Sequence, residues 1–187
     1  MALRIIAGEL KGRKLRSLRG TKTRPTADRI REAIFNILGF QIQGSTVLDL
    51  FAGTGALGIE ALSRGAESVV FVDVDNDSIS VLQENLKSLS LESRTKIIRW
   101  DLTRNLNCLG SWRSAFNLIF MDPPYNKNII EPTLLNLHSG QSMEKGARII
   151  VEHSYLEPIL KRQLPLKISD QRRYGKTLVS FLNYKES

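Results

Sequence analysis

The sequence is poor in the residues that build disulfide frameworks and metal centres. Its single cysteine, Cys108, excludes an internal disulfide, and its two histidines, His138 and His153, stand at no recognisable metal-ligand spacing. We therefore expect no structural metal. No apolar run approaches the roughly 18 residues of a membrane span, and the start of the chain lacks the apolar stretch of a secretory signal. These absences favour a cytoplasmic protein with no membrane partner.

The length and the apolar content suit one globular domain. The chain has 187 residues, 42% of them hydrophobic, which is enough for a sizeable core. No internal repeat, low-complexity segment or domain boundary is evident. We therefore predict a single domain over residues 1–187, in which residues 1–40 form a basic arm and helix and residues 45–187 form the core. We treat the arm as an appendage to that core.

The positive charge is concentrated at the start of the chain. The net charge is +8, and residues 1–31 contain ten basic and two acidic side chains, so they carry the whole excess. Such segregation is typical of a protein that binds a polyanion. One alternative is a solvated basic face, and another is an organelle transit peptide. The patterns at 5–8 and 10–13, which are typical of short strands with glycine turns, oppose the transit peptide, because they predict a folded segment.

A helix follows this basic segment. Pro25 disfavours helix at the residue before it, and Gly39 favours a stop. Ile30 and Ile34 recur at helical spacing on an apolar stripe. Arg29 and Arg31 fall off that stripe, so we expect both to be free to face a ligand.

Strands and helices then alternate. Apolar, β-branched runs predict strands near residues 46–50, 68–72, 96–99, 116–121, 147–152 and 177–182. Helical spacing predicts helices near 56–64, 79–89 and 132–137. This alternation is typical of an α/β fold with an open, doubly wound sheet and helices on both faces.

A glycine-rich turn follows the first predicted strand. Residues 53–58, GTGALG, satisfy the pattern G-x-G-x-x-G between a strand and a helix, and Asp73 follows Gly53 by 20 residues, at the end of the next strand. Glycines let the backbone approach a cofactor, and an acid at that spacing can bind both ribose hydroxyls. Taken alone, the pattern predicts an NAD site as well as it predicts a site for any other cofactor that contains a ribose.

Asp49 favours a different cofactor. It lies four residues before Gly53, at the carboxyl end of the first predicted strand, where its carboxylate would repel a pyrophosphate. S-adenosylmethionine carries a sulfonium and an ammonium instead, which a nearby acid attracts. Asp101, after the third predicted strand, can then accept a hydrogen bond from the adenine amino group.

The stretch DPPY follows the fourth predicted strand. Two prolines, Pro123 and Pro124, end the strand, because they donate no hydrogen bond. The Asp122 carboxylate and the Pro123 carbonyl can accept both hydrogens of an aromatic amine, which exposes its lone pair. Tyr125 can stack on the base. These residues suit methyl transfer to a ring amine, without a metal or a covalent intermediate.

Three motifs together resemble one family. VLDLFAGTGALGIEALSRGA, DPPY and RPTADRIREAIFNIL are similar to the RsmD family of bacterial methyltransferases, and the similarity extends to RRYGKTLVSFL at the end of the chain. The resemblance implies a class I, Rossmann-like fold with a mostly parallel seven-stranded sheet whose last strand is antiparallel. It also implies S-adenosylmethionine-dependent methylation of a guanine 2-amino group in 16S ribosomal RNA, within a small ribosomal subunit or an assembly particle.

The resemblance assigns cofactor contacts by motif position. It implies that the methionine end of the cofactor is lined by Asp49, Phe51, Gly53 and Gly55. It further implies that Asp73 binds the ribose and that Asp101 with Leu102 holds the adenine.

We expect the basic segment to bind the RNA backbone. Its candidate phosphate contacts are Arg13, Lys14, Arg24, Arg29 and Arg31, and Thr26 and Arg24 can also reach the rim of the active site. Three other functions stay open on the residues alone. They are adenine-N6 methylation of DNA or RNA, NAD-dependent oxidoreduction, and RNA binding without catalysis.

Overall fold

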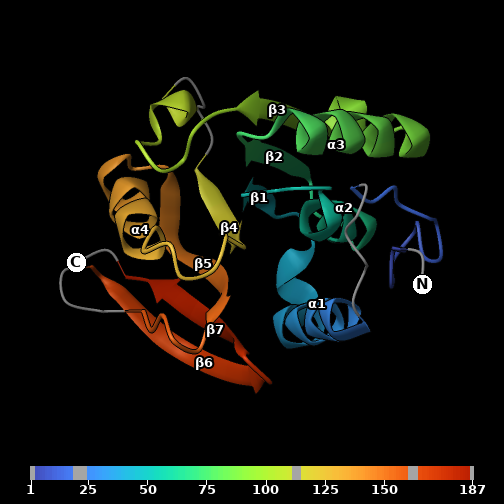
Figure 1. The fold of residues 1–187 in the computed structure, drawn as a ribbon. Helices are drawn as coiled ribbons and strands as arrows, with labels where there is room; N and C mark the ends of the chain where they lie inside the picture. The colour runs from blue at the N-terminus through green and yellow to red at the C-terminus, as the bar shows by residue number, and fades with distance from the viewer. Residues whose placement is uncertain (1–2, 19–24, 111–114, 160–163, 186–187) are drawn as a thin grey trace.

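A seven-stranded sheet forms the centre of the protein (Figure 1). The computed structural model describes residues 3–18, 25–110, 115–159 and 164–185, with side chains from residue 28 onward in the second range. The strand order is β3-β2-β1-β4-β5-β7-β6. The strands are β1 (Thr46–Leu50), β2 (Ser68–Asp73), β3 (Thr95–Arg99), β4 (Phe116–Met121), β5 (Met143–Ser154), β6 (Leu166–Tyr174) and β7 (Thr177–Tyr184).

Helices cover both faces of this sheet (Figure 1). The α-helices are α1 (Pro25–Leu38), α2 (Ala56–Ser63), α3 (Asn76–Leu89) and α4 (Ile130–Ser139), and the short 3-10 turns are η1 (Gly39–Ile42), η2 (Glu92–Arg94) and η3 (Asn107–Leu109). Strands β1 to β5 pair in parallel, whereas β7 is antiparallel to β5 and to β6. The predicted doubly wound, mostly parallel sheet is confirmed.

Strand β6 is the one strand in the described part of the chain that the residue pattern did not predict. Its half-buried positions alternate with exposed ones, and polar side chains such as Lys167, Gln171 and Arg173 occupy much of it. It lies at the edge of the sheet and pairs with β7 alone. An edge strand with one solvated face needs no apolar run, so it lacked the signal that marked the other six.

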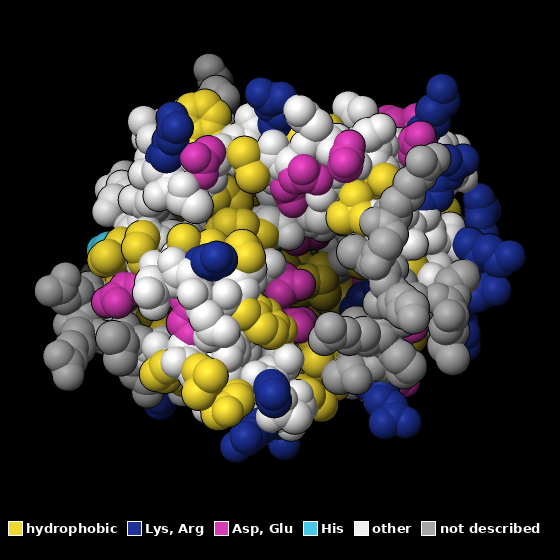
Figure 2. Space-filling model, viewed as in Figure 1, with side chains coloured by type: hydrophobic (Ala, Val, Ile, Leu, Met, Phe, Trp, Pro, Cys, Tyr) yellow, Lys and Arg dark blue, Asp and Glu magenta, His cyan; other side chains and the backbone are white. Residues whose placement is uncertain are grey.

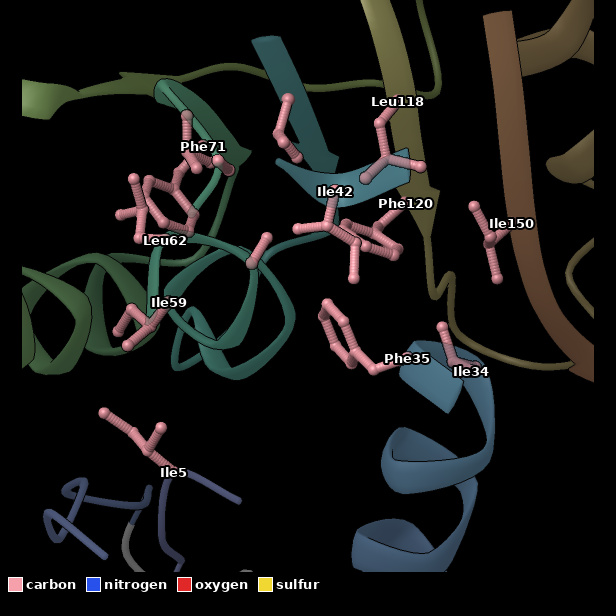
Figure 3. Close-up of a cluster of buried hydrophobic side chains, with 14 of the residues drawn as sticks. Ile5, Ile34, Phe35, Ile42, Ile59, Leu62, Phe71, Leu118, Phe120 and Ile150 are labelled. Carbon is pink, nitrogen blue, oxygen red and sulfur yellow. The ribbon is translucent and has the colours of Figure 1, made fainter. Parts of the chain in front are cut away.

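Two apolar clusters lie on opposite faces of the sheet. One packs α1, α2 and α3 against the sheet, and the other packs α4 and the segment before β4. In the first cluster, Phe35 of α1 meets Phe120 of β4 with ring centroids 5.5 Å apart, and Ile59 and Phe71 continue the layer (Figure 3). Ile5 of the N-terminal segment belongs to the same cluster.

Residues 3–18, here called the N-terminal segment, are therefore part of the core. Leu3, Ile5 and Leu15 are buried, which corrects the expectation of an appendage. The two expected short strands reduce to a single antiparallel bridge between Arg4 and Lys14. The segment packs on α2 and α3 because its apolar side chains face the same cluster as theirs.

Arg31 is buried, so the expectation that it is free to face a ligand is wrong. Its guanidinium donates to the carbonyl of Arg4 and pairs with Asp28 at 3.2 Å and with Glu60 at 3.9 Å. The side chain leaves the apolar stripe of α1 as the spacing predicted, but the N-terminal segment covers it. Arg31 therefore holds the segment in place rather than contacting solvent.

Glu60 on α2 is the main polar anchor of the N-terminal segment. Its carboxylate is fully buried and accepts from the main-chain nitrogens of Ile6 at 2.7 Å and Ala7 at 3.0 Å. It also pairs with Arg64 at 2.8 Å. A buried carboxylate is stable only when its acceptor sites are filled, and here two main-chain donors and the Arg64 guanidinium fill them, with the Arg31 guanidinium nearby as an ion-pair partner.

We predict that Glu60→Ala destabilises the protein by about 3–5 kcal/mol, because it leaves two main-chain donors unpaired and removes one of the two carboxylates beside buried Arg31. Urea denaturation measures the loss. The matched control is Glu84→Ala, which removes an exposed carboxylate paired with exposed Arg16 and should cost less than about 1 kcal/mol. Equal losses in the two variants would contradict the anchoring role.

Candidate active site

The carboxyl ends of the parallel strands bring acidic side chains to one edge of the sheet. Asp49 lies within β1, Asp73 ends β2, Asp122 follows β4 and Glu152 lies near the end of β5. Because parallel strands end at the same edge, these four acids are neighbours although they are distant in sequence. Acidic side chains gather in a hollow near the centre of the face shown in Figure 2.

Strand register places the same four acids on one face. Asp49 pairs with Phe71 and with Phe120. Asp73 and Asp122 follow those two phenylalanines by two residues, which returns each to the same face. Met121 pairs with Val151, so Asp122 and Glu152 are the next residues on neighbouring strands.

The glycine turn between β1 and α2 requires left-handed backbone. Phe51, Gly53 and Gly55 have φ of 59°, 55° and 78°. A Cβ on Gly55 would lie 2.3 Å from Leu82 Cδ1, so packing against α3 admits only glycine there. A Cβ on Gly53 would meet no atom within 4 Å, so the backbone at Gly53 borders open space. A ligand can approach the main chain at that point.

Asp49 is buried beneath this turn. Its Oδ2 accepts from the main-chain nitrogen of Gly58 at 2.9 Å, which ties the first turn of α2 to the end of β1. Loss of hydration raises the pKa of Asp49 to about 8, and this outweighs the hydrogen bond from Gly58, which favours the charged form. A nearby cation would stabilise the charged form of this buried acid over its neutral form.

Asp73 ends β2 and pairs with Arg99, the last residue of β3. Asp101 follows two residues after Arg99, and between them the Trp100 nitrogen donates to the Asp73 carbonyl at 2.8 Å. Asp73 accepts from the Gly53 nitrogen at 2.7 Å, so it also orders the glycine turn. Asp101 accepts from the Thr103 hydroxyl at 2.6 Å, and the bonds from Thr103 lower its pKa. The ribose contact expected of Asp73 and the adenine contact expected of Asp101 stay predictions.

Leu102 points the other way. Its side chain is buried in the cluster on the α4 face of the sheet. The adenine contact that the resemblance implied for Leu102 stays a prediction, and it would fall to the main chain of that residue.

The DPPY stretch is held by two acids that the sequence patterns did not identify. The Tyr125 hydroxyl donates to Glu152 Oε1 at 2.8 Å and lies 3.2 Å from Thr177 Oγ1. The nitrogens of Asn126 and Asn128 donate to the carboxylate of Glu157 at 2.7 and 2.8 Å. These bonds hold Tyr125 against β5 and the loop after DPPY against the residues that follow β5.

The signal that could have found Glu152 is its place in the chain. It is an acid near the end of a buried strand, and the apolar pattern predicts it as the last residue of that strand. Its contact with DPPY depends on which strand lies next to β4. That order is set by tertiary structure, and a local pattern does not contain it.

Like charges and poor hydration raise the pKa of several groups here. Burial raises the pKa of Asp122, and the negative charges of Glu152 and Asp49 raise it further. Burial also raises the pKa of Glu152 and of the Tyr125 phenol. Asp122 is nevertheless an exposed residue by accessible surface, so solvent reaches it and the upward shift is smaller than full burial would cause.

The two histidines lie outside this acidic cluster. His153 is buried in β5, with Nε2 2.8 Å from Ser180 Oγ and Nδ1 2.9 Å from the Glu157 carbonyl, as expected for a polar strand residue rather than a catalytic base. His138 lies in α4, 2.9 Å from the Tyr184 hydroxyl. In the described residues, no group of three or more acidic, His or Cys side chains is arranged to hold a metal ion.

Of the six candidate RNA-binding residues, the structure describes four side chains. Arg13, Lys14 and Arg29 are exposed, and Arg31 is buried as reported above. Arg24 and the side chain of Thr26 lie outside the described part of the structure. Lys and Arg side chains gather at the right-hand margin of Figure 2, where Figure 1 shows the N-terminal segment. No described helix is long and apolar enough to cross a membrane.

Comparisons with known proteins agree with this fold. The sheet order and the Rossmann-like arrangement are those of a class I methyltransferase, and the solved structure of "Putative methyltransferase yhhF from Escherichia coli" matches with a TM-score of 0.86 at 26% identity over the whole of both chains. Residues 3–183 match the family described as "Conserved hypothetical protein 95". The chain belongs to this family, the RsmD family of methyltransferases.

Two relatives span most of the chain. "Putative rRNA methyltransferase YlbH" of Bacillus subtilis is 39% identical over 178 residues, which cover 95% of this chain and 97% of the relative. "Ribosomal RNA small subunit methyltransferase D" of Escherichia coli K12 is 35% identical over 150 residues, which cover 80% and 74%.

The raised pKa of Asp49 predicts a pH-dependent stability. Its folded-state pKa of about 8 exceeds its ordinary value, so the stabilisation from this group is complete below about pH 4 and is lost as the pH rises through about 8. Asp49→Asn keeps an acceptor for the Gly58 nitrogen and cannot ionise. We expect the ligand-free variant to gain stability over the wild type as the pH rises from 5 to 8, by on the order of 2 kcal/mol. Thermal unfolding at several pH values measures the gain, and parallel curves would contradict it.

Proposed function

We propose that the protein methylates the exocyclic 2-amino group of a guanine in 16S ribosomal RNA, with S-adenosylmethionine as methyl donor. The observation that carries the proposal is the shared face of Asp49, Asp73 and Asp122, which sets the glycine turn beside the DPPY stretch. The names of the relatives support an RNA substrate in the small ribosomal subunit. We place the reaction in the cytoplasm, on the subunit or an assembly particle.

The residues present fit S-adenosylmethionine. Open space in front of Gly53 admits a ligand to the main chain, and Asp73 can accept from ribose hydroxyls beside its existing bond to the Gly53 nitrogen. The buried acid Asp49 favours a cationic group and opposes the pyrophosphate of NAD. When bound, this cofactor supplies a methyl group already activated on a sulfonium.

Side-chain and main-chain groups of DPPY orient the amine, and one of them takes its proton. Asp122 and the Pro123 carbonyl accept the two amine hydrogens, which directs the nitrogen lone pair toward the glycine turn. Tyr125 is partly exposed and held by Glu152, so its ring offers a face on which a base can stack. Asp122 stabilises the positive charge that grows on the nitrogen and then accepts the proton.

The second candidate is methylation of the adenine 6-amino group, because DPPY chemistry serves any exocyclic amine. The deciding test transfers tritiated methyl groups onto unmodified ribosomal RNA and onto small-subunit particles, followed by digestion to nucleosides. We expect labelled N2-methylguanosine. Labelled 6-methyladenosine as the sole product would reject the guanine assignment, and comparison of the two substrates shows whether the particle is needed.

Replacement of Asp122 tests catalysis itself. We expect Asp122→Ala to lower kcat by about 10²–10⁴-fold, because it removes the acceptor of the amine hydrogens and of the proton, while RNA still binds. Single-turnover methylation and filter binding measure the two effects. The control is Glu144→Ala, an exposed acid near the amino end of β5, on the opposite edge of the sheet. Full activity in Asp122→Ala would refute this mechanism.

The exposed basic residues test RNA docking. We expect Arg13→Ala, Lys14→Ala and Arg29→Ala, combined, to weaken RNA binding and to flatten its dependence on salt. Each lost phosphate contact should reduce the slope of log K against log salt by about 0.7–0.9. Binding titrations at several salt concentrations measure it.

The control for docking uses Lys145→Ala with Lys167→Ala, two exposed residues near the amino ends of β5 and β6. These ends lie at the other edge of the sheet from Asp122. An equal change of slope in the control, or no change in the first variant, would show that the N-terminal segment and α1 do not dock the RNA.

A further inference from the structure

Glu152 is placed to touch the same base as Asp122. The two residues follow the register pair Met121 and Val151 on neighbouring parallel strands, so they lie side by side on one face. Neighbouring strands are about 4.8 Å apart, which lets two side chains contact adjacent atoms of one planar ring. Glu152 belongs to neither the glycine turn nor DPPY.

The Tyr125 hydroxyl holds Glu152 as an acceptor. The Tyr125 hydroxyl donates to its Oε1 at 2.8 Å, and Thr177 Oγ1 lies 3.2 Å from the same hydroxyl. An ionised carboxylate accepts at about four lone-pair sites and donates at none. One bond from Tyr125 therefore fixes the orientation of Glu152 and leaves acceptor capacity for a ligand.

Guanine and adenine differ at the ring position beside the amine. In guanine, the N1–H donor is next to the 2-amino group. In adenine, N1 next to the 6-amino group is an acceptor. A carboxylate at that position attracts the guanine edge and repels the lone pair of the adenine edge. A site with two neighbouring carboxylates therefore suits the guanine edge.

We propose that Glu152 accepts the N1–H of the target guanine while Asp122 accepts from its 2-amino group, so that Glu152 selects guanine against adenine. This inference rests on the proposed function. It assigns specificity to β5 and leaves the proton transfer at Asp122.

The test changes the N1 edge of the base and one atom of the protein. 2-Aminopurine keeps the amine at C2, lacks the O6 oxygen of guanine and carries an acceptor at N1. The loss of O6 is common to both enzymes, so it does not alter the comparison between them. We compare kcat/KM for RNA with guanosine or 2-aminopurine ribonucleoside at the methylated position, for the wild type and for Glu152→Gln. The glutamine amide can donate to the N1 of 2-aminopurine, so the preference for guanosine should fall by about tenfold or more in the variant.

The change in preference separates specificity from mere support of Tyr125. A structural role predicts that Glu152→Gln slows both substrates equally, and that result would overturn the inference. The matched control is Thr177→Val, which removes the other partner of the Tyr125 hydroxyl and leaves both carboxylates in place. We expect it to leave the preference for guanosine unchanged, and a fall equal to that of Glu152→Gln would also overturn the inference.

Failure of the proposed function would be recognised in the wild type alone. A wild-type enzyme that forms no N2-methylguanosine would reject the proposed function and the inference with it. A wild-type enzyme that methylates guanosine, combined with an unchanged preference in Glu152→Gln, would reject the role of Glu152 only.

Discussion

The parallel register of β1, β2, β4 and β5 is the constraint on which the site depends. It brings the carboxyl ends of four strands to one edge, and the two-residue period of a strand turns their acids to one face. Each acid loses hydration there, which makes its charged form less stable, and the raised pKa values of Asp49, Asp122 and Glu152 reflect that loss. Raised pKa values of this kind are common at functional sites, because a ligand of complementary charge stabilises the charged form of the acids.

The N-terminal segment is joined to the cofactor side of this edge through one buried side chain. Asn85 of α3 accepts from the Arg16 nitrogen at 2.7 Å and donates to the Thr54 carbonyl of the glycine turn at 3.0 Å. Glu60 of α2 holds the same segment at Ile6 and Ala7. The segment that carries Arg13 and the turn that borders the proposed cofactor space therefore share a rigid support. The predicted appendage is thus part of the scaffold of the site.

Local patterns predicted the features whose chemistry is contiguous in sequence. The glycine turn after Asp49 and the prolines after Asp122 were recognised because backbone requirements leave a mark within a few residues. Glu152 and the burial of Arg31 were not, because they depend on which strand lies beside β4 and on what covers α1. The polar edge strand β6 was not predicted from the sequence for a related reason. Its stability comes from pairing with β7, so its own residues need little apolar character.

The separation of charge over the molecule explains how a polyanion can present one base to an acidic hollow. Phosphates are repelled by the cluster around Asp122 and attracted by exposed residues such as Lys14 and Arg29. A base edge rich in N–H donors carries no charge and meets acceptors in the hollow. In the proposed reaction, the RNA backbone therefore stays outside while the guanine enters, which requires the target to leave its stack or to lie in a loop. Under this proposal, the same acids orient the amine and exclude the rest of the strand.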